Sequence, residues 1–308
     1  MEPPKQKGPP TPKMMFEMRR ELEGTTFPPF IQPHCLANVK NFEVREDDVV
    51  LATYPKCGTH WMMEVIQLIK TDGHVDQIER ENDRRAIGCI EFTIFPEMKE
   101  AIVDVVDKKP SPRMYGTHLP ATLLPAQIWT KKPKVVYVTR NPKDAANSFY
   151  NFMNADSKTQ DDRIGWDEFC SVFMSEKAIF GNWFDHTLSY WSHRDDENVF
   201  FITFEEMKKD IQSVISRLAT FLEVTITPEG MERIIEHSSM EGMKKTYAKI
   251  EKEHELGELL TKAHGKLPFL KKGIVGGWKA RFTVAQSEAM DKVLKERLSG
   301  TGLEHHYN

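Results

Sequence analysis

A cation, a glycine and two hydrogen-bonding residues stand between two apolar segments in the first quarter of the chain. The loop 56–60 (KCGTH) follows the β-branched run 49–53 and precedes the apolar stretch 61–69. A strand, a short polar loop and a helix in this order present backbone N–H groups and a helix N-terminus to an anion. Gly58 lets the backbone approach a ligand closely, and Lys56 adds a full positive charge. The segment predicts a site for a phosphate or sulfate group.

The pattern of this loop differs from a Walker A phosphate loop, because its lysine precedes the glycine instead of following it. An ordinary loop with a solvated lysine explains the segment nearly as well when the segment is taken alone. A second segment of the same kind favours the anion site. The apolar run 135–139 ends at Arg140, and Asn141-Pro142 marks a turn into a helix. Ser148 follows Arg140 at i+8, two helical turns on; a surface ion pair of Arg140 with Asp144 is the alternative.

A histidine follows a third strand candidate, 112–117. His118 lies directly before Leu119-Pro120, which ends regular structure, and a neutral imidazole there could take a proton from a hydroxyl group. Most lone histidines are structural, and we interpret three others in that way: His186, His193 and His237.

The order of these segments predicts the fold class. Strand candidates at 49–53, 112–117, 135–139 and 199–203 alternate with helix candidates at 167–174, 182–193, 210–222, 227–237 and 283–299. Strands that alternate with helices indicate an α/β fold, here a single domain with a central parallel sheet flanked by helices. Ligands bind beyond the carboxyl ends of such strands. Lys56, His118 and Arg140 are therefore expected to meet at one edge, with Phe204-Glu205 after the fourth strand.

Length and composition limit the class of protein. The chain has 308 residues and 40% hydrophobic content, which is enough for a large core. Its net charge of −4 gives no sign of nucleic-acid or membrane-surface binding. No apolar run is long enough to span a bilayer. Residues 1–14 are predicted to be a disordered Pro/Lys-rich tail, with one domain over 15–308. Four cysteines without a CxxC pair fit reduced thiols in a cytoplasmic protein. The helix end beside Cys57 could lower the pKa of its thiol.

Four segments, taken in order, resemble the motifs of the cytosolic sulfotransferases. TYPKCGTHW is similar to the family's TYPKSGTTW, and THLP matches the sequence around the family's catalytic histidine. RNPKDAANSFYNF resembles the family's 3′-phosphate segment, and KKGIVGGWKARFT resembles its RKGxxGDWKxxFT. The likeness extends from about residue 40 to residue 300. It implies a P-loop-kinase-like sulfotransferase fold.

The resemblance also implies an activity and a cofactor. The enzyme would move a sulfonate group from 3′-phosphoadenosine-5′-phosphosulfate to a hydroxyl or amine of a small molecule, releasing adenosine 3′,5′-bisphosphate and needing no metal. His118 would be the general base, and Lys56 would stabilise negative charge as the sulfonate leaves. The cofactor-binding residues implied are Lys56, Cys57, Gly58, Thr59, His60, Trp61, Arg140, Ser148, Phe204, Ser238, Met240, Lys271, Lys272 and Gly273.

Two further sets of residues follow from the same resemblance. Phe92 and Phe152 match positions that line the family's apolar acceptor pocket. The family's short KxxxTVxxxE dimerisation motif is matched by Lys279, Thr283, Val284 and Glu288. The resemblance therefore implies a weak homodimer.

The chain departs from the family pattern at four positions. Gly116 stands where many members have lysine, and Phe204 replaces a tyrosine that reaches the adenine. Lys271 replaces an arginine and so provides a point charge instead of a bidentate donor. Gly277 replaces an aspartate, which is expected to loosen its loop. Together these changes predict weaker cofactor binding than is usual in the family.

Two other functions remain open at this point, and the acceptor cannot be named. A nucleotide-dependent kinase of related fold is one alternative, although the chain lacks a Walker A loop. A nucleotide-binding relative with weakened catalysis is the other, and the four departures favour it. The residues near 85–100, 152–165 and 240–265 would shape the acceptor pocket.

Overall fold

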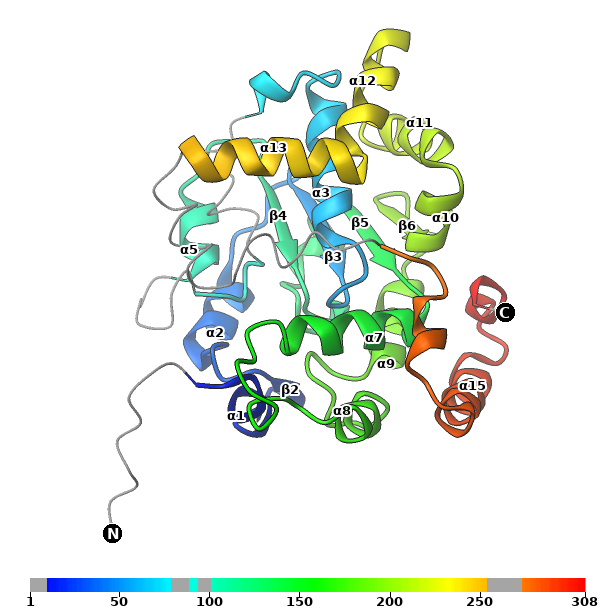
Figure 1. Ribbon diagram of the computed structural model, residues 1–308. Coiled ribbons are helices and arrows are strands. Elements are labelled where there is room, and N and C mark those ends of the chain that lie inside the picture. The colour runs from blue at the N-terminus through cyan, green and yellow to red at the C-terminus, as the bar shows by residue number, and fades with distance from the viewer. Residues whose placement is uncertain (1–9, 79–88, 94–100, 254–272, 308) are drawn as a thin grey trace.

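The computed structural model describes residues 10–78, 89–93, 101–253 and 273–307. Its centre is a four-stranded parallel sheet with the order β4-β3-β5-β6 (Figure 1). The strands are β3 (Val49–Thr53), β4 (Met114–Thr117), β5 (Lys134–Thr139) and β6 (Val199–Thr203). The four strand candidates and the parallel sheet are thus confirmed. In the register of the sheet Thr53 lies opposite Val138, and Thr139 lies opposite Thr203, so these strands end at one edge.

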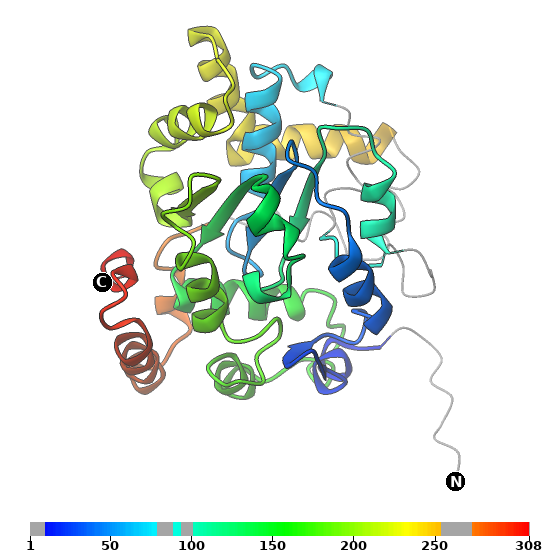
Figure 2. The same cartoon turned by 180° about the vertical axis from the view of Figure 1, so that it is seen from behind.

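Successive side chains in each strand point to opposite faces of the sheet, and this divides the hydrophobic core into two layers. Val50 and Tyr137 belong to one cluster, whereas Leu51 and Val138 belong to the other. The second cluster lies under α3 (Thr59–Lys70), α11 (Ile211–Phe221) and α12 (Pro228–Ser238). The first lies under α2 (Pro33–Asn41), α5 (Ile102–Asp107), α7 (Pro142–Met153), α8 (Trp166–Phe173) and α9 (Trp183–Trp191). Figures 1 and 2 show the sheet covered from both sides. Such a sheet, buried on both faces, explains the continuous apolar runs in its strands.

The helices follow local sequence signals closely. Thr227 accepts a hydrogen bond from Gly230 N at the start of α12, and Asn141 accepts two from the first turn of α7. Thr283 and Gln286 form the expected capping box of α15 (Val284–Leu298). The remaining helices are α1 (Pro12–Glu17), α6 (Gln127–Lys131), α10 (Phe204–Lys209), α13 (Met240–Glu253) and the short turns at Val75–Gln77, Ala121–Leu123, Gly277–Ala280 and Leu303–His306. No helix in the described ranges is long and apolar enough to cross a membrane.

The start of the chain differs from expectation. The tail boundary placed at residue 14 falls inside α1, because Thr11 caps the helix through Met14 N and Phe16 packs on Phe169 at a ring distance of 6.0 Å. Residues 1–9 lie outside the described part of the chain. An antiparallel hairpin of β1 (Arg20–Leu22) and β2 (Thr25–Phe27) follows α1 and was not predicted. Strands of only three residues give too little alternation to be detected in a sequence.

Candidate active site

The loop between β3 and α3 is tightly turned and leads directly into the N-terminus of α3. Lys56 and Gly58 both have positive φ, 69° and 113°. The value at Lys56 is uncommon for a residue other than glycine. A Cβ atom at residue 58 would lie 3.0 Å from Cδ2 of Phe204, so this close approach also needs glycine. The side chain of Thr53 is joined to that of Thr59 by a 2.7 Å hydrogen bond, which ties the strand end to the first turn of α3. Backbone N–H groups in loops of this kind attract negative charge.

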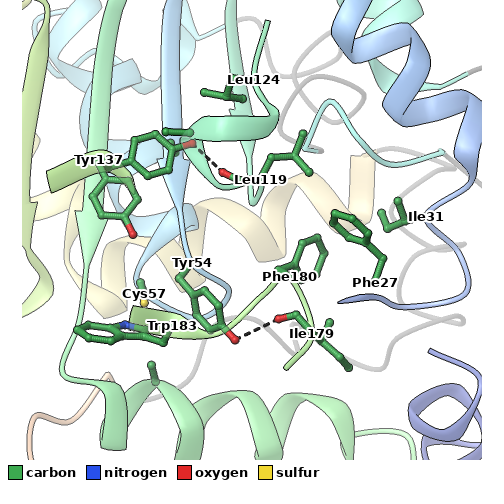
Figure 3. Close-up of a cluster of buried hydrophobic side chains, with 14 of the residues drawn as sticks. Phe27, Ile31, Tyr54, Cys57, Leu119, Leu124, Tyr137, Ile179, Phe180 and Trp183 are labelled. Carbon is green, nitrogen blue, oxygen red and sulfur yellow. Dashed lines mark hydrogen bonds between the residues drawn. The ribbon is translucent and has the colours of Figure 1, made fainter. Parts of the chain in front are cut away.

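Cys57 contributes its backbone and not its thiol. The side chain is fully buried, and burial raises the pKa of the thiol far above its ordinary value. The expectation that the helix end lowers this pKa is therefore wrong, because loss of solvation outweighs the nearby positive charges. Figure 3 shows the sulfur within the hydrophobic cluster, beside the indole ring of Trp183.

His118 follows β4 and holds a proton on only one ring nitrogen. Its Nδ1 lies 2.8 Å from the carbonyl oxygen of Thr53, and since a carbonyl only accepts, Nδ1–H is the donor. The lone pair is then on Nε2. Burial lowers the pKa of the imidazole to about 4, and the charge of Lys56 adds to this effect. The side chain is therefore a neutral base at neutral pH, as a general base must be.

The residues that fix His118 in place come from distant parts of the chain. Glu91 accepts the backbone N–H of His118 at 2.7 Å and the hydroxyl of Thr117 at 3.0 Å. Burial raises the pKa of this carboxyl group to about 7. On the other side, Nε2–H of His186 donates to the carbonyl oxygen of His118 at 3.0 Å, while its Nδ1 accepts from Tyr137. His186 thus has a supporting position, in agreement with its structural interpretation. Sequence reasoning missed Glu91, since no motif marks it.

Aromatic side chains form a wall next to His118. The rings of Phe92 and Phe180 lie 6.1 Å and 5.6 Å from the imidazole, and Phe30 packs edge-on against Phe92 at 5.5 Å. Phe92 was predicted to line an acceptor pocket, and its ring lies beside His118. Phe180 was not predicted. It has a positive φ of 67°, a conformation that is strained for a bulky residue and is found where function demands a particular geometry.

Arg140 lies beneath the anion loop and is not part of a surface ion pair. The residue is only 6% exposed. Its guanidinium donates to the carbonyl oxygens of Lys56 at 3.3 Å and of Ile274 at 2.9 Å. Its Nε is buried and has no partner within the described residues. Asp144, the alternative partner, instead accepts two backbone N–H groups at 276 and 278. A buried guanidinium with an unused donor fits an anionic ligand.

The other predicted cofactor residues lie on several elements, and two of them fall outside the described residues. Trp61 and Phe204 lie together with ring centroids 5.3 Å apart, and the guanidinium of Arg140 lies 4.4 Å from the Phe204 ring centroid. Ser148 lies partly exposed on α7. The rest stand as follows: Ser238 is buried at the end of α12, Met240 begins α13, Gly273 has a φ of 53°, and Lys271 and Lys272 lie outside the described residues.

His60 and Gly277 also bear on the fit of an anionic cofactor. Burial, together with Lys56 and His118, lowers the pKa of His60 to about 3.

Gly277 was expected to loosen its loop, but Asn147 donates to its carbonyl oxygen at 3.2 Å, and Asp144 holds the residues on both sides. The loop is therefore docked on α7. No cluster of three or more metal-ligating side chains occurs in the described ranges.

A nucleotide that carries phosphate groups fits this set of residues. The backbone N–H groups of the loop, the unused donor of Arg140 and the ammonium of Lys56 are all suited to oxygen anions. The paired rings of Trp61 and Phe204 offer an aromatic surface next to them. All these groups lie within a few residues of the ends of β3, β5 and β6.

Known proteins share both the sequence and the fold. The sulfotransferase domain family matches residues 46–302. Sulfotransferase 1B1 of Mus musculus is 35% identical over 290 residues, which cover 93% of this chain and 95% of the relative. The amine sulfotransferase of Oryctolagus cuniculus is 34% identical, and the matched region covers 85% of this chain and 84% of the relative. The crystal structure of mouse sulfotransferase SULT7A1 complexed with PAP has a TM-score of 0.75 at 28% identity. The matched region covers 94% of this chain and 97% of that chain. Retinol dehydratase, at 21% identity and a TM-score of 0.73, shares the fold.

Proposed function

Because the chain belongs to the sulfotransferase family, we propose that it moves a sulfonate group from 3′-phosphoadenosine-5′-phosphosulfate to a hydroxyl or amine of a small-molecule acceptor. When bound, this cofactor supplies the sulfonate group. The observation that carries the proposal is the state of His118, a neutral imidazole whose Nδ1 is tied to the Thr53 carbonyl. Its free lone pair is available on Nε2, beside the aromatic wall.

His118 and Lys56 have different parts in this reaction. Nε2 of His118 accepts the proton of the acceptor hydroxyl, a general-base contribution of about 10²–10⁴-fold. Lys56 places its positive charge where negative charge develops on the leaving phosphate. Glu91 and His186 position the histidine through its backbone and do not touch the reacting atoms. Transfer of this kind depends on positioning and charge stabilisation, which these residues provide.

The cofactor would be held by the anion loop and by the residues around Arg140. The backbone of 56–60 would hold the 5′-phosphate. The adenine would be held by Trp61, Phe204, Ser238 and Met240. Arg140 would hold the 3′-phosphate. Ser148 and the segment 271–273 complete that last group. The unused Nε of Arg140 supports this assignment.

The acceptor would have an apolar body. Phe92 and Phe180 lie beside His118, and burial of an aromatic or aliphatic ring of the acceptor against them would be favourable. A radiolabelled sulfonate-transfer screen over phenols, steroids, amines and small polar alcohols would identify it. We expect turnover to be highest with the apolar members of this panel.

Nucleotide binding provides the first test. Isothermal titration calorimetry should show tighter binding of adenosine 3′,5′-bisphosphate than of 5′-AMP, because only the former reaches the cations assigned to the 3′-phosphate. Equal affinity for the two nucleotides would contradict the assignment. Transfer that survives EDTA would exclude a magnesium-dependent kinase, while bound nucleotide without turnover on any acceptor would favour a non-catalytic relative.

We also propose that the chain from the start of α1 to residue 308 forms one catalytic domain located in the cytoplasm, so that the domain boundary moves from residue 15 to the start of this helix. The family match over 46–302 and a hydrophobic core that reaches from Phe16 to Leu303 support a single unit. The relatives that share this sequence are sulfotransferases over nearly their whole length.

A further inference from the structure

The ammonium group of Lys56 lies on an aromatic ring of the expected acceptor pocket. Its Nζ is 4.2 Å from the ring centroid of Phe152, within the range of a cation–π contact. Phe152 stands near the end of α7, and 38% of the residue is exposed. The contact joins the residue assigned to the leaving phosphate with a residue assigned to the acceptor.

The surrounding structure aims Lys56 toward this ring. The backbone of Lys56 is held in a left-handed conformation, and Arg140 donates to its carbonyl oxygen at 3.3 Å. Phe152 follows Ser148 by one helical turn, so the two side chains share a face of α7. The charge of Lys56 also lowers the pKa values of His118 and His60.

We propose that Phe152 is a positioning residue whose ring competes with the 5′-phosphate for the Lys56 ammonium. The inference rests on the proposed function, because it takes the 5′-phosphate as the group that Lys56 meets next. A full negative charge attracts an ammonium more strongly than the quadrupole of a ring does. Nucleotide binding therefore draws Lys56 off the ring, and the lost contact reduces the observed affinity.

Removal of the ring should then strengthen nucleotide binding. A partly exposed cation–π contact corresponds to about a two- to fivefold change in an equilibrium constant. Phe152→Leu should bind adenosine 3′,5′-bisphosphate more tightly by this factor, since the nucleotide no longer competes with the ring. Phe152→Tyr keeps an aromatic face and should bind like the wild type.

A double-mutant cycle followed by calorimetry tests the contact directly. Adenosine 3′,5′-bisphosphate is titrated into the wild type, Phe152→Leu, Phe152→Tyr, Lys56→Met and the double variant Lys56→Met/Phe152→Leu, with circular dichroism to show that each is folded. In the Lys56→Met background the Phe152→Leu change should have no effect on affinity, because the ammonium for which the ring and the nucleotide compete has been removed.

The outcomes separate this inference from the proposed function. Unchanged or weaker binding by Phe152→Leu, or the same gain with and without Lys56, would overturn the role of Phe152 and leave the sulfotransferase assignment in place. A wild-type chain that does not bind the bisphosphate would overturn both.

Discussion

At the scale of single residues, the candidate site is defined by the protonation state of His118. The hydrogen bond to the Thr53 carbonyl selects one tautomer, and burial, which lowers the pKa of the imidazole to about 4, keeps the ring neutral. The neighbouring Lys56 opposes protonation of the same ring, so one residue supplies the cation and the other the base. A cation beside a neutral imidazole is an arrangement typical of catalytic sites.

Substitution of His118 should separate catalysis from binding. We expect His118→Ala to abolish turnover and to leave the affinity for adenosine 3′,5′-bisphosphate unchanged, because the imidazole faces the acceptor. Lys56→Ala should reduce both, since its charge acts on the phosphate in the ground state and the transition state. Steady-state kinetics and calorimetry on the two variants provide the check. Near-wild-type kcat for His118→Ala would place the base elsewhere.

The pH dependence of the reaction follows from the same residue. With its pKa lowered to about 4, His118 stays unprotonated as the pH falls through about 6.5, where a free histidine would gain its proton. We expect kcat/KM to remain level from about pH 7 to about pH 5 on this account and to fall only near pH 4. A pH–rate profile, with circular dichroism at each pH, measures this. An acid limb centred near 6.5 would show that the site does not depress the pKa.

Phe204 allows one departure from the family to be tested. The ring is 5% exposed and packs on Trp61, so a hydroxyl added to it would stand at the proposed adenine site. We expect Phe204→Tyr to tighten bisphosphate binding by up to about tenfold, the effect of one good hydrogen bond. Calorimetry gives the answer. Weaker binding would mean that the site has repacked around phenylalanine.

At the scale of elements, the site depends on how the C-terminal loop docks on α7. Asp144, in the first turn of this helix, accepts Gly276 N at 2.7 Å and Trp278 N at 3.0 Å. Arg281 donates to the side chains of Asn147 and Asn151 farther along. These bonds fix the loop that leads to Gly273, on the side assigned to the 3′-phosphate.

Weakening this docking should affect the two nucleotides unequally. Asp144→Asn keeps one acceptor oxygen and loses the charge, and we expect it to lower the affinity for adenosine 3′,5′-bisphosphate by about tenfold. The affinity for 5′-AMP should hardly change. Glu296→Gln is the control, because Glu296 pairs with Lys292 on the exposed surface of α15. Equal losses for both nucleotides would indicate a general effect on α7.

At the scale of the whole molecule, one apolar residue stands out on the surface. Val284 is 75% exposed at the start of α15, and Lys279, Thr283 and Glu288 around it are also exposed. Thr283 caps α15, and this role needs no second chain. A twofold contact would bring Val284 against its own copy.

We expect a weak homodimer through this segment. Two antiparallel copies would place Lys279 of one chain near Glu288 of the other, and an interface this small is sensitive to a single change. Sedimentation of the wild type and of Val284→Glu at micromolar concentration should give a dimer and a monomer respectively. A wild-type monomer, or a dimer that tolerates Val284→Glu, would exclude this interface.

The sequence by itself determined the sheet, the order of its strands along the chain and the residues at their ends. Periodicity, caps and motifs are local properties, so β3 to β6 and α15 could be predicted from them. Tertiary structure decided what those residues meet. Glu91, Phe180 and His186 reach His118 from segments far away in the chain, and no local pattern encodes such contacts. The state of Cys57 was predicted wrongly for the same reason, because burial, which sets its pKa, is a property of the whole fold.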